Sequence, residues 1–189
     1  KCKNKRRLSS TPADMDLISG CINNDRKAQE LLYKHFYGPM ASICLRYTRN
    51  EYDAVEVLNN GFLKVFKNIQ QYDGTKASLY TWIRTIMVNS AIDFIRQRDR
   101  QKRNMEISVV AEPHIDSEVI QKLNAEELLK LVRKLPPATQ AVFNLYVIEG
   151  YNHKEIGTVM GISEGTSKWH LSEARKQLQK LLQTLYVVR

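Results

Sequence analysis

A helix–turn–helix pattern near the C-terminal end is the feature that most constrains the fold. Residues 151–170 read YNHKEIGTVMGISEGTSKWH. Asn152 followed three residues later by Glu155 is a capping-box pattern, which predicts the start of a helix. Gly161 is suited to end that helix, because glycine readily takes the positive φ found at helix C-termini, and Ser163 is suited to cap a second helix. In DNA-binding proteins, the second helix of such a pair enters the major groove.

The second predicted helix has an apolar face and a polar face. The apolar face comprises Leu171, Ala174, Leu178, Leu181, Leu182 and Leu185. The opposite side comprises Gly165, Trp169, Ser172, Glu173 and Lys176, with Thr166, Lys168 and Arg175 beside it. Short polar groups suit base edges and cations suit phosphates, so this face indicates DNA binding. An ordinary helical hairpin with a solvated charged face is the alternative.

Charge narrows the class of partner. The 189 residues carry a formal net charge of +9, which favours a polyanion without separating DNA, RNA and an acidic membrane. The sequence has no apolar run of bilayer length. The basic segment 1–7 is not followed by the apolar region of a signal peptide, so we expect a cytoplasmic protein.

Nothing in the sequence indicates catalysis. Cys2, Cys21 and Cys44 are odd in number and scattered, and the four histidines lack metal-ligand spacing. No glycine-rich phosphate-binding pattern is present. We therefore expect no catalytic residue, no metal and no cofactor, and a protein that is not an enzyme.

Helical periodicity predicts an all-α protein with two small domains joined by a flexible linker. The expected domain boundaries are a basic arm at 1–13, a first domain at 14–103, a linker at 104–116 and a second domain with the helix-turn-helix at 117–189. The expected helices are a short one after Asp14, then 26–37, 39–49, about 51–69, 77–101, one containing Leu123 to Leu135, 138–149, and the final pair. Gly38-Pro39 and Pro136-Pro137 are read as helix breaks.

Two helices of the first domain have polar faces of interest. The helix near 51–69 turns Asp53, Glu56, Asn59, Asn60, Lys64 and Lys67 outward, which by itself is explained by favourable placement of acids near a helix N-terminus. The 77–101 helix turns Thr85, Asn89, Asp93, Arg96 and Arg100 outward, and Tyr72, Tyr80 and Trp82 lie beside it. Such aromatic side chains stack on exposed bases, although Trp82 is equally explained as a core residue.

Three stretches resemble one protein family in the expected order. Residues 53–70, DAVEVLNNGFLKVFKNIQ, resemble the region-two helix of bacterial sigma factors that docks on RNA polymerase. The stretch from Trp82 through Asn89, Asp93 and Arg96 resembles the helix that reads and melts the −10 element. Residues 135–178 resemble region four. The chain thus resembles the extracytoplasmic-function group, the minimal two-domain kind.

The resemblance implies core RNA polymerase (its β′ clamp and β flap), promoter DNA and an anti-sigma factor as partners. It assigns polymerase docking to Asp53, Glu56, Asn59 and Asn60. It assigns −10 contacts to Tyr72, Lys76, Ser78, Trp82, Asn89, Asp93, Arg96 and Arg98. It assigns −35 contacts to Thr166, Lys168, Trp169, Ser172, Arg175 and Lys176.

The sequence departs from the family pattern at Asn59-Asn60, where many relatives have Gln-Glu or Gln-Asp, at Glu173, where many have a base, and at Trp169, where a small residue is common. Two other functions stay open. One is a stand-alone helix-turn-helix regulator acting as a dimer, which would have no use for a polymerase-docking helix. The other is an inactive sigma-like protein that titrates an anti-sigma factor, against which the cations on both promoter-facing helices argue.

Overall fold

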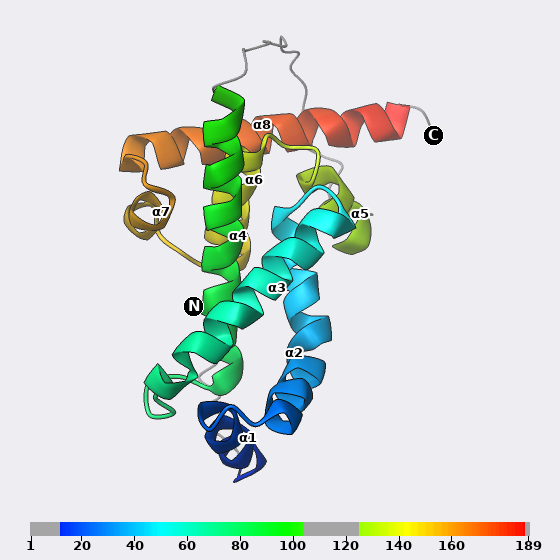
Figure 1. Cartoon of the computed structure of the whole chain (residues 1–189). Helices are drawn as coiled ribbons and strands as arrows, with labels where there is room; N and C mark the ends of the chain where they lie inside the picture. Colours follow the sequence, from blue (N-terminus) through cyan, green and yellow to red (C-terminus); the bar gives the residue numbers. More distant parts are fainter. Residues whose placement is uncertain (1–11, 104–124, 188–189) are drawn as a thin grey trace. The chain divides into compact units, whose positions relative to one another are not determined.

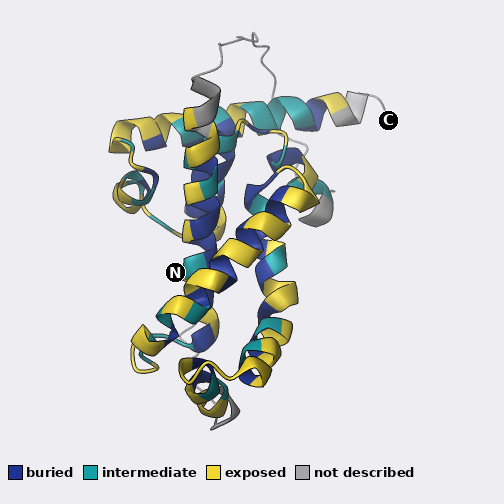
Figure 2. Ribbon diagram, viewed as in Figure 1, coloured by how far each residue is buried: buried dark blue, intermediate teal, exposed yellow. Residues whose placement is uncertain are grey.

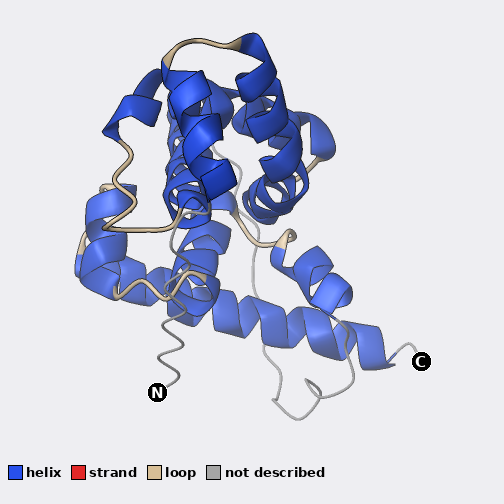
Figure 3. Cartoon of the chain, turned by 90° about the horizontal axis from the view of Figure 1, so that it is seen from below, coloured by secondary structure: helices blue, strands red, loops and turns tan. Residues whose placement is uncertain are grey.

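The computed structural model describes residues 12–103 and 125–187, and every regular element in those ranges is helical (Figures 1 and 3). This confirms the all-α prediction. The elements are α1 (Pro12–Ile22), α2 (Arg26–Tyr47), α3 (Glu51–Asn68), the short 3-10 helix η1 (Ile69–Gln71), α4 (Leu79–Arg103), α5 (Ala125–Val132), α6 (Pro137–Phe143), the π-helical η3 (Asn144–Ile148), α7 (His153–Met160) and α8 (Glu164–Val187). The predicted linker 104–116 and residues 1–11 of the predicted arm lie outside the described residues.

The chain divides into two compact units. Residues 1–45 and 52–90 make the first, and residues 46–51 and 91–189 make the second. α4 is one continuous helix that contributes to both. Within the described ranges, no helix combines the length and apolar character needed to cross a bilayer.

The predicted break at Gly38-Pro39 is wrong, because α2 runs unbroken from Arg26 to Tyr47 with Pro39 inside it. Proline removes one backbone donor and disfavours a helix interior by roughly 3 kcal/mol. The buried stripe of Leu32, Phe36, Met40, Ile43, Cys44 and Tyr47 continues through the proline at helical spacing. Burying those side chains contributes about 1.5–3 kcal/mol each, which outweighs the local penalty.

The first unit packs α3 between α2 and α4. One side of α3 is buried and the other exposed, as the two colours along this helix show in Figure 2. Phe62 lies against Tyr33 of α2, with ring centroids 4.6 Å apart. A Cβ at Gly61 would overlap the side chain of Met87 on α4, so glycine here permits close helix packing. This packing holds α3 in place, so that its outer face is exposed to solvent.

The second unit assembles α5, α6, α7 and α8 around one apolar centre. Leu135 and Leu145 are fully buried, as is Ile156 of α7. Val132, Leu135 and Ala174 form a cluster against which Phe143 and Leu178 pack. The helix predicted over 138–149 is α6 followed by η3, and Gly150, with φ of 79°, follows it. Leu171, Ala174 and Leu182 of the apolar face predicted for α8 are buried, and Leu178 packs against the cluster. This packing fixes which side of α8 faces outward.

The two cysteines within the described residues are expected to be unreactive in the folded protein. Cys21 and Cys44 are buried thiols that form no disulfide, and burial raises the pKa of the Cys21 thiol, with Asp25 adding to the effect. A raised thiol pKa favours folding below the usual thiol value and loses that contribution as pH rises through the folded value. Thiolate is the reactive form, so we expect iodoacetamide to label both residues only after unfolding. Mass spectrometry of native and denatured protein at pH 8 checks this, and rapid labelling of native Cys21 would contradict it.

Candidate nucleic-acid interface

The helix-turn-helix forms as the sequence predicts. The Asn152 side chain accepts from the Glu155 backbone N–H at 2.9 Å, and the Glu155 carboxylate accepts from the Asn152 N–H at 2.8 Å. Gly161 ends α7 in the left-handed conformation with φ of 67°. The Ser163 hydroxyl then accepts from the Thr166 N–H at 3.0 Å and caps α8. These caps satisfy backbone donors that a helix start otherwise leaves open.

Two contacts that the sequence did not reveal hold the turn. A Cβ at Gly157 would lie 2.8 Å from the backbone oxygen of Ile162, so the chain needs a glycine where α7 approaches the turn. His153 Nδ1 lies 3.0 Å from the hydroxyl of the buried Ser167, which links the start of α7 to α8. The helical spacing of Gly157 gives no sign of the close approach, because the neighbouring oxygen comes from the far side of the turn.

The polar face of α8 is open to solvent. All six residues predicted to contact the −35 element are exposed: Thr166, Lys168, Trp169, Ser172, Arg175 and Lys176. Trp169 is 59% exposed, whereas tryptophan is highly buried on average, so its ring is available for a contact with DNA. Lys168 Nζ lies 2.7 Å from Glu164, and hydrogen bonding to Lys168 lowers the pKa of that carboxyl. An exposed pair of this kind contributes little to stability, so Lys168 is readily released to a phosphate.

Contacts beside this face orient two of its residues. The Trp169 ring meets His170 edge-on, with centroids 4.9 Å apart, and His170 Nδ1 lies 3.0 Å from the hydroxyl of Thr139 on α6. Glu173 is half-buried, and its carboxylate accepts from the Gln177 amide at 2.6 Å on the same helix. That hydrogen bond holds the Glu173 carboxylate along α8.

The loop between η1 and α4 holds three of the predicted −10 residues, and a fourth, Trp82, lies in the first turn of α4. The Tyr72 hydroxyl donates to the Ala77 carbonyl at 3.0 Å, and its ring meets Trp82 at 5.6 Å. The Ser78 hydroxyl accepts from the Thr81 N–H at 3.2 Å and caps the start of α4. Lys76 is exposed, whereas Tyr72, Ser78 and Trp82 are half-buried. Half-burial accommodates both interpretations of Trp82, because one part of the indole packs while another stays open.

The remaining −10 residues lie along α4. Asn89, Asp93 and Arg98 are exposed and Arg96 is half-buried. Residues 89, 93 and 96 share one side of the helix because they are spaced by four and three. The guanidinium of Arg98 lies 4.8 Å from the ring centre of Phe94. Asn89, Asp93 and Arg96 thus place one amide, one carboxylate and one guanidinium group along one side of the helix, and Arg98, two residues beyond Arg96, lies on the opposite side.

Of the four predicted docking residues, the structure places Asp53 differently. Asp53 is buried, so its predicted outward position is wrong. The reason is its register: residues 53, 57 and 61 are spaced by four, and Val57 and Gly61 are buried. Glu56, Asn59 and Asn60 are exposed as predicted.

The outer face of α3 is more apolar than the sequence reading proposed. Tyr52, Val55 and Leu63 are exposed beside Glu56 and Asn59, and Leu63 is 67% exposed. The sequence analysis did not predict Tyr52, Val55 and Leu63, although residues 52, 55, 59 and 63 follow one another at helical steps of three and four. Exposed apolar side chains in a row mark a surface that another protein covers. We call Tyr52, Val55, Glu56, Asn59, Asn60 and Leu63 the α3 face.

Comparison with known proteins identifies the family. Residues 32–101 match Sigma-70 region 2, and residues 125–178 match Sigma-70, region 4. The ECF RNA polymerase sigma-E factor of Haemophilus influenzae is 23% identical over 184 residues, covering 91% of this chain and 96% of that protein. The chain belongs to the extracytoplasmic-function sigma factors. The Escherichia coli sigma-E factor is 24% identical over 190 residues, covering 94% of this chain and 98% of its own length.

Solved structures support the fold of this sigma factor. The sigma factor RpoE of Bartonella quintana, crystallised with the anti-sigma factor NepR, superposes with a TM-score of 0.51. It is 18% identical and covers 82% of this chain and 96% of its own.

In the part of the chain that the structure describes, no group of three or more His, Cys, Asp or Glu side chains is arranged to hold a metal.

Proposed function

We propose that this chain binds core RNA polymerase and directs it to promoters that carry particular −10 and −35 elements. The observation that carries the proposal is the presence of three distinct surfaces in one chain: the α3 face, the 72–78 loop with α4, and the polar face of α8. A stand-alone regulator needs only the last of these. The proposed domains are residues 14–103 for region two and 117–189 for region four, with a linker at 104–116 and a basic arm at 1–13.

Region two would dock on the polymerase and melt the −10 element. The α3 face would meet the β′ clamp, with Leu63, Val55 and Tyr52 as its apolar centre. The 72–78 loop with Trp82 would receive a base unstacked from the −10 strand, since a base must leave the stack before a protein can enclose it. Asn89, Asp93, Arg96 and Arg98 would contact that strand or its phosphates. Aromatic side chains next to cations suit single-stranded DNA.

Region four would hold the −35 element in the major groove through the polar face of α8. Glu173, whose carboxylate is held by Gln177, would accept a hydrogen bond from a cytosine amino group or lie next to the bases without contacting them. The second unit also has an apolar groove whose lining includes Leu128, Val147 and Leu178. This groove suits the β flap of the polymerase.

An anti-sigma factor is a further proposed partner. The Bartonella quintana neighbour was crystallised with one, and this chain exposes apolar residues that such a protein would cover. The family role is that of a non-enzymatic initiation factor, so we propose that the chain adds no reaction and no cofactor of its own. Its site of action would be the cytoplasm, where RNA polymerase works.

The test is transcription by core RNA polymerase with and without this protein on a library of randomised −35 and −10 elements. Enrichment of a subset of promoters is expected only when the protein is present. Binding to polymerase without any enriched transcript would favour the anti-sigma decoy. A stable dimer that binds a palindrome tightly without polymerase would favour the stand-alone regulator.

Replacing Trp169 with Ala tests the −35 assignment. Truncating an interface tryptophan to alanine commonly costs about 1 kcal/mol or more, so we expect roughly a tenfold loss of transcription on a selected promoter. The loss should disappear on a promoter whose −35 element is scrambled, because the wild type has nothing to read there. Equal losses on both promoters would contradict a −35 role.

A further inference from the structure

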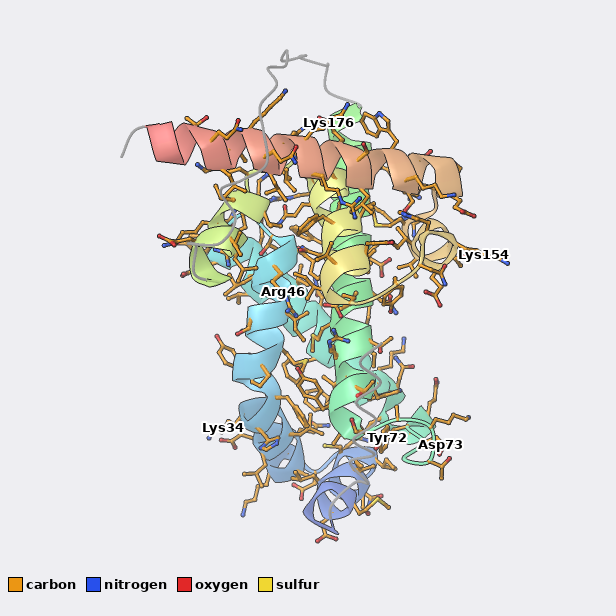
Figure 4. All side chains as sticks on the ribbon, turned by 180° about the vertical axis from the view of Figure 1, so that it is seen from behind. Lys34, Arg46, Tyr72, Asp73, Lys154 and Lys176 are labelled. Atoms are coloured by element: carbon orange, nitrogen blue, oxygen red, sulfur yellow. The ribbon has the colours of Figure 1, made fainter. Side chains whose placement is uncertain are left out.

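One carboxylate organises the 72–78 loop. Oδ1 of Asp73 accepts from the backbone N–H of Thr75 at 2.9 Å and from the Thr75 hydroxyl at 2.6 Å. Its Oδ2 lies 3.2 Å from Nζ of Lys76. The Asp73 carbonyl accepts from the Lys76 N–H at 3.1 Å, so main chain and side chain close the same turn. Figure 4 shows Asp73 beside Tyr72 on this loop.

These contacts also settle the charge of Asp73. Hydrogen bonds from the Thr75 hydroxyl and backbone, and then from Lys76, lower its pKa to about 2. The carboxyl is therefore ionised throughout the physiological range. A lowered carboxyl pKa stabilises the folded loop above the usual Asp value, and that contribution is lost as pH falls toward 2.

A negative charge in this position needs an explanation. The loop lies beside side chains proposed to meet the −10 strand, and a carboxylate there repels phosphates. Tyr72 and Trp82 are fixed independently, through the Ala77 carbonyl and through ring contact. Thr75 and Lys76 are exposed, and each makes a side-chain contact with Asp73.

We propose that Asp73 is a positioning residue, which through its hydrogen bonds from Thr75 keeps the 72–78 loop already shaped to receive an unstacked −10 base. This inference rests on the proposed function. It assigns to Asp73 no contact with DNA; the residue acts through the loop. An ordered loop has less conformational entropy to lose when it closes on a base, and preorganisation of this kind favours the bound state.

Two substitutions at Asp73 distinguish the effect of the loop geometry from the effect of the negative charge. Asp73→Ala removes every side-chain contact to Thr75 and Lys76. Asp73→Asn keeps an oxygen that accepts from Thr75 but removes the charge that attracts Lys76. Glu30→Gln is the matched control, because Glu30 forms an exposed ion pair with Lys34 on α2, away from the loop (Figure 4).

The experiment uses full-length protein with core RNA polymerase on a promoter selected from the library, with 2-aminopurine in the −10 element to report opening. We expect Asp73→Ala to open the promoter about tenfold more slowly, because misplacement of groups that position a reacting partner has effects of this order or greater. It should also lose base preference at one −10 position while keeping its −35 preference. Asp73→Asn should open within about twofold of wild type, since the Thr75 hydrogen bonds carry the geometry.

Each possible result of this experiment decides between the positioning role of Asp73 and another explanation. Wild-type opening rate and base preference in Asp73→Ala would overturn the positioning role. Equal slowing by Asp73→Asn would also overturn it, because charge rather than loop geometry would then decide. An equal effect of Glu30→Gln would mean a general loss of surface charge and would overturn it as well. A wild type that opens no selected promoter would overturn the proposed function, and this inference with it.

Discussion

Replacing Leu63 with Asp is expected to abolish binding to core RNA polymerase while leaving the fold intact. Leu63 is 67% exposed on the α3 face, so its substitution removes little packing within the protein. At an interface, the new carboxylate would be buried without a partner. Residues that anchor an interface commonly contribute about 2 kcal/mol or more, so we expect at least about a 30-fold loss of affinity.

Leu31→Asp is the matched control for that experiment. Leu31 is also an exposed leucine, 57% exposed, but it lies on α2 outside the α3 face. Affinity for core polymerase measured by fluorescence anisotropy should be unchanged in this variant. Equal losses in both variants would indicate a general effect of added negative charge and would contradict docking through the α3 face.

Replacing Gly157 with Ala is expected to disable region four. The new Cβ would lie 2.8 Å from the Ile162 backbone oxygen, which has no rotamer by which to move away. The turn must therefore shift, and overpacking of this kind costs about 1–3 kcal/mol. A shift of the turn displaces the N-terminal part of α8, so transcription from promoters that need a −35 element should fall most.

Gly38→Ala is the control for the glycine experiment. A Cβ at Gly38 meets nothing within 4 Å, and the residue lies inside α2. Alanine there should raise the free energy of unfolding by about 0.5–1 kcal/mol, because glycine loses more conformational entropy on folding. Thermal unfolding followed by circular dichroism compares the two, and a Gly157→Ala protein that unfolds like wild type and keeps −35 selectivity would contradict the role of the turn.

Local patterns determined much of this protein in advance. The capping box at Asn152 and Glu155, the left-handed Gly161 and the cap at Ser163 all form as their sequence predicts, because each depends on residues three or four positions apart. The exposed face of α8 follows in the same way from its apolar stripe. The family resemblance added the functional meaning of the acidic helix, which the residues alone explained as a helix-dipole effect.

Tertiary structure decided the rest, since these features depend on which side chains the packing of the helices buries and on how the chain folds back at the turn. Pro39 lies inside a helix because a buried stripe on both sides of it outweighs its local penalty. The need for Gly157 comes from an oxygen across the turn, and the full outer face of α3 became evident only once its buried side was fixed. The spacing of apolar residues in the sequence thus specified that each helix has an apolar and a polar face. Packing between helices specified which residues of each helix stay exposed to a partner.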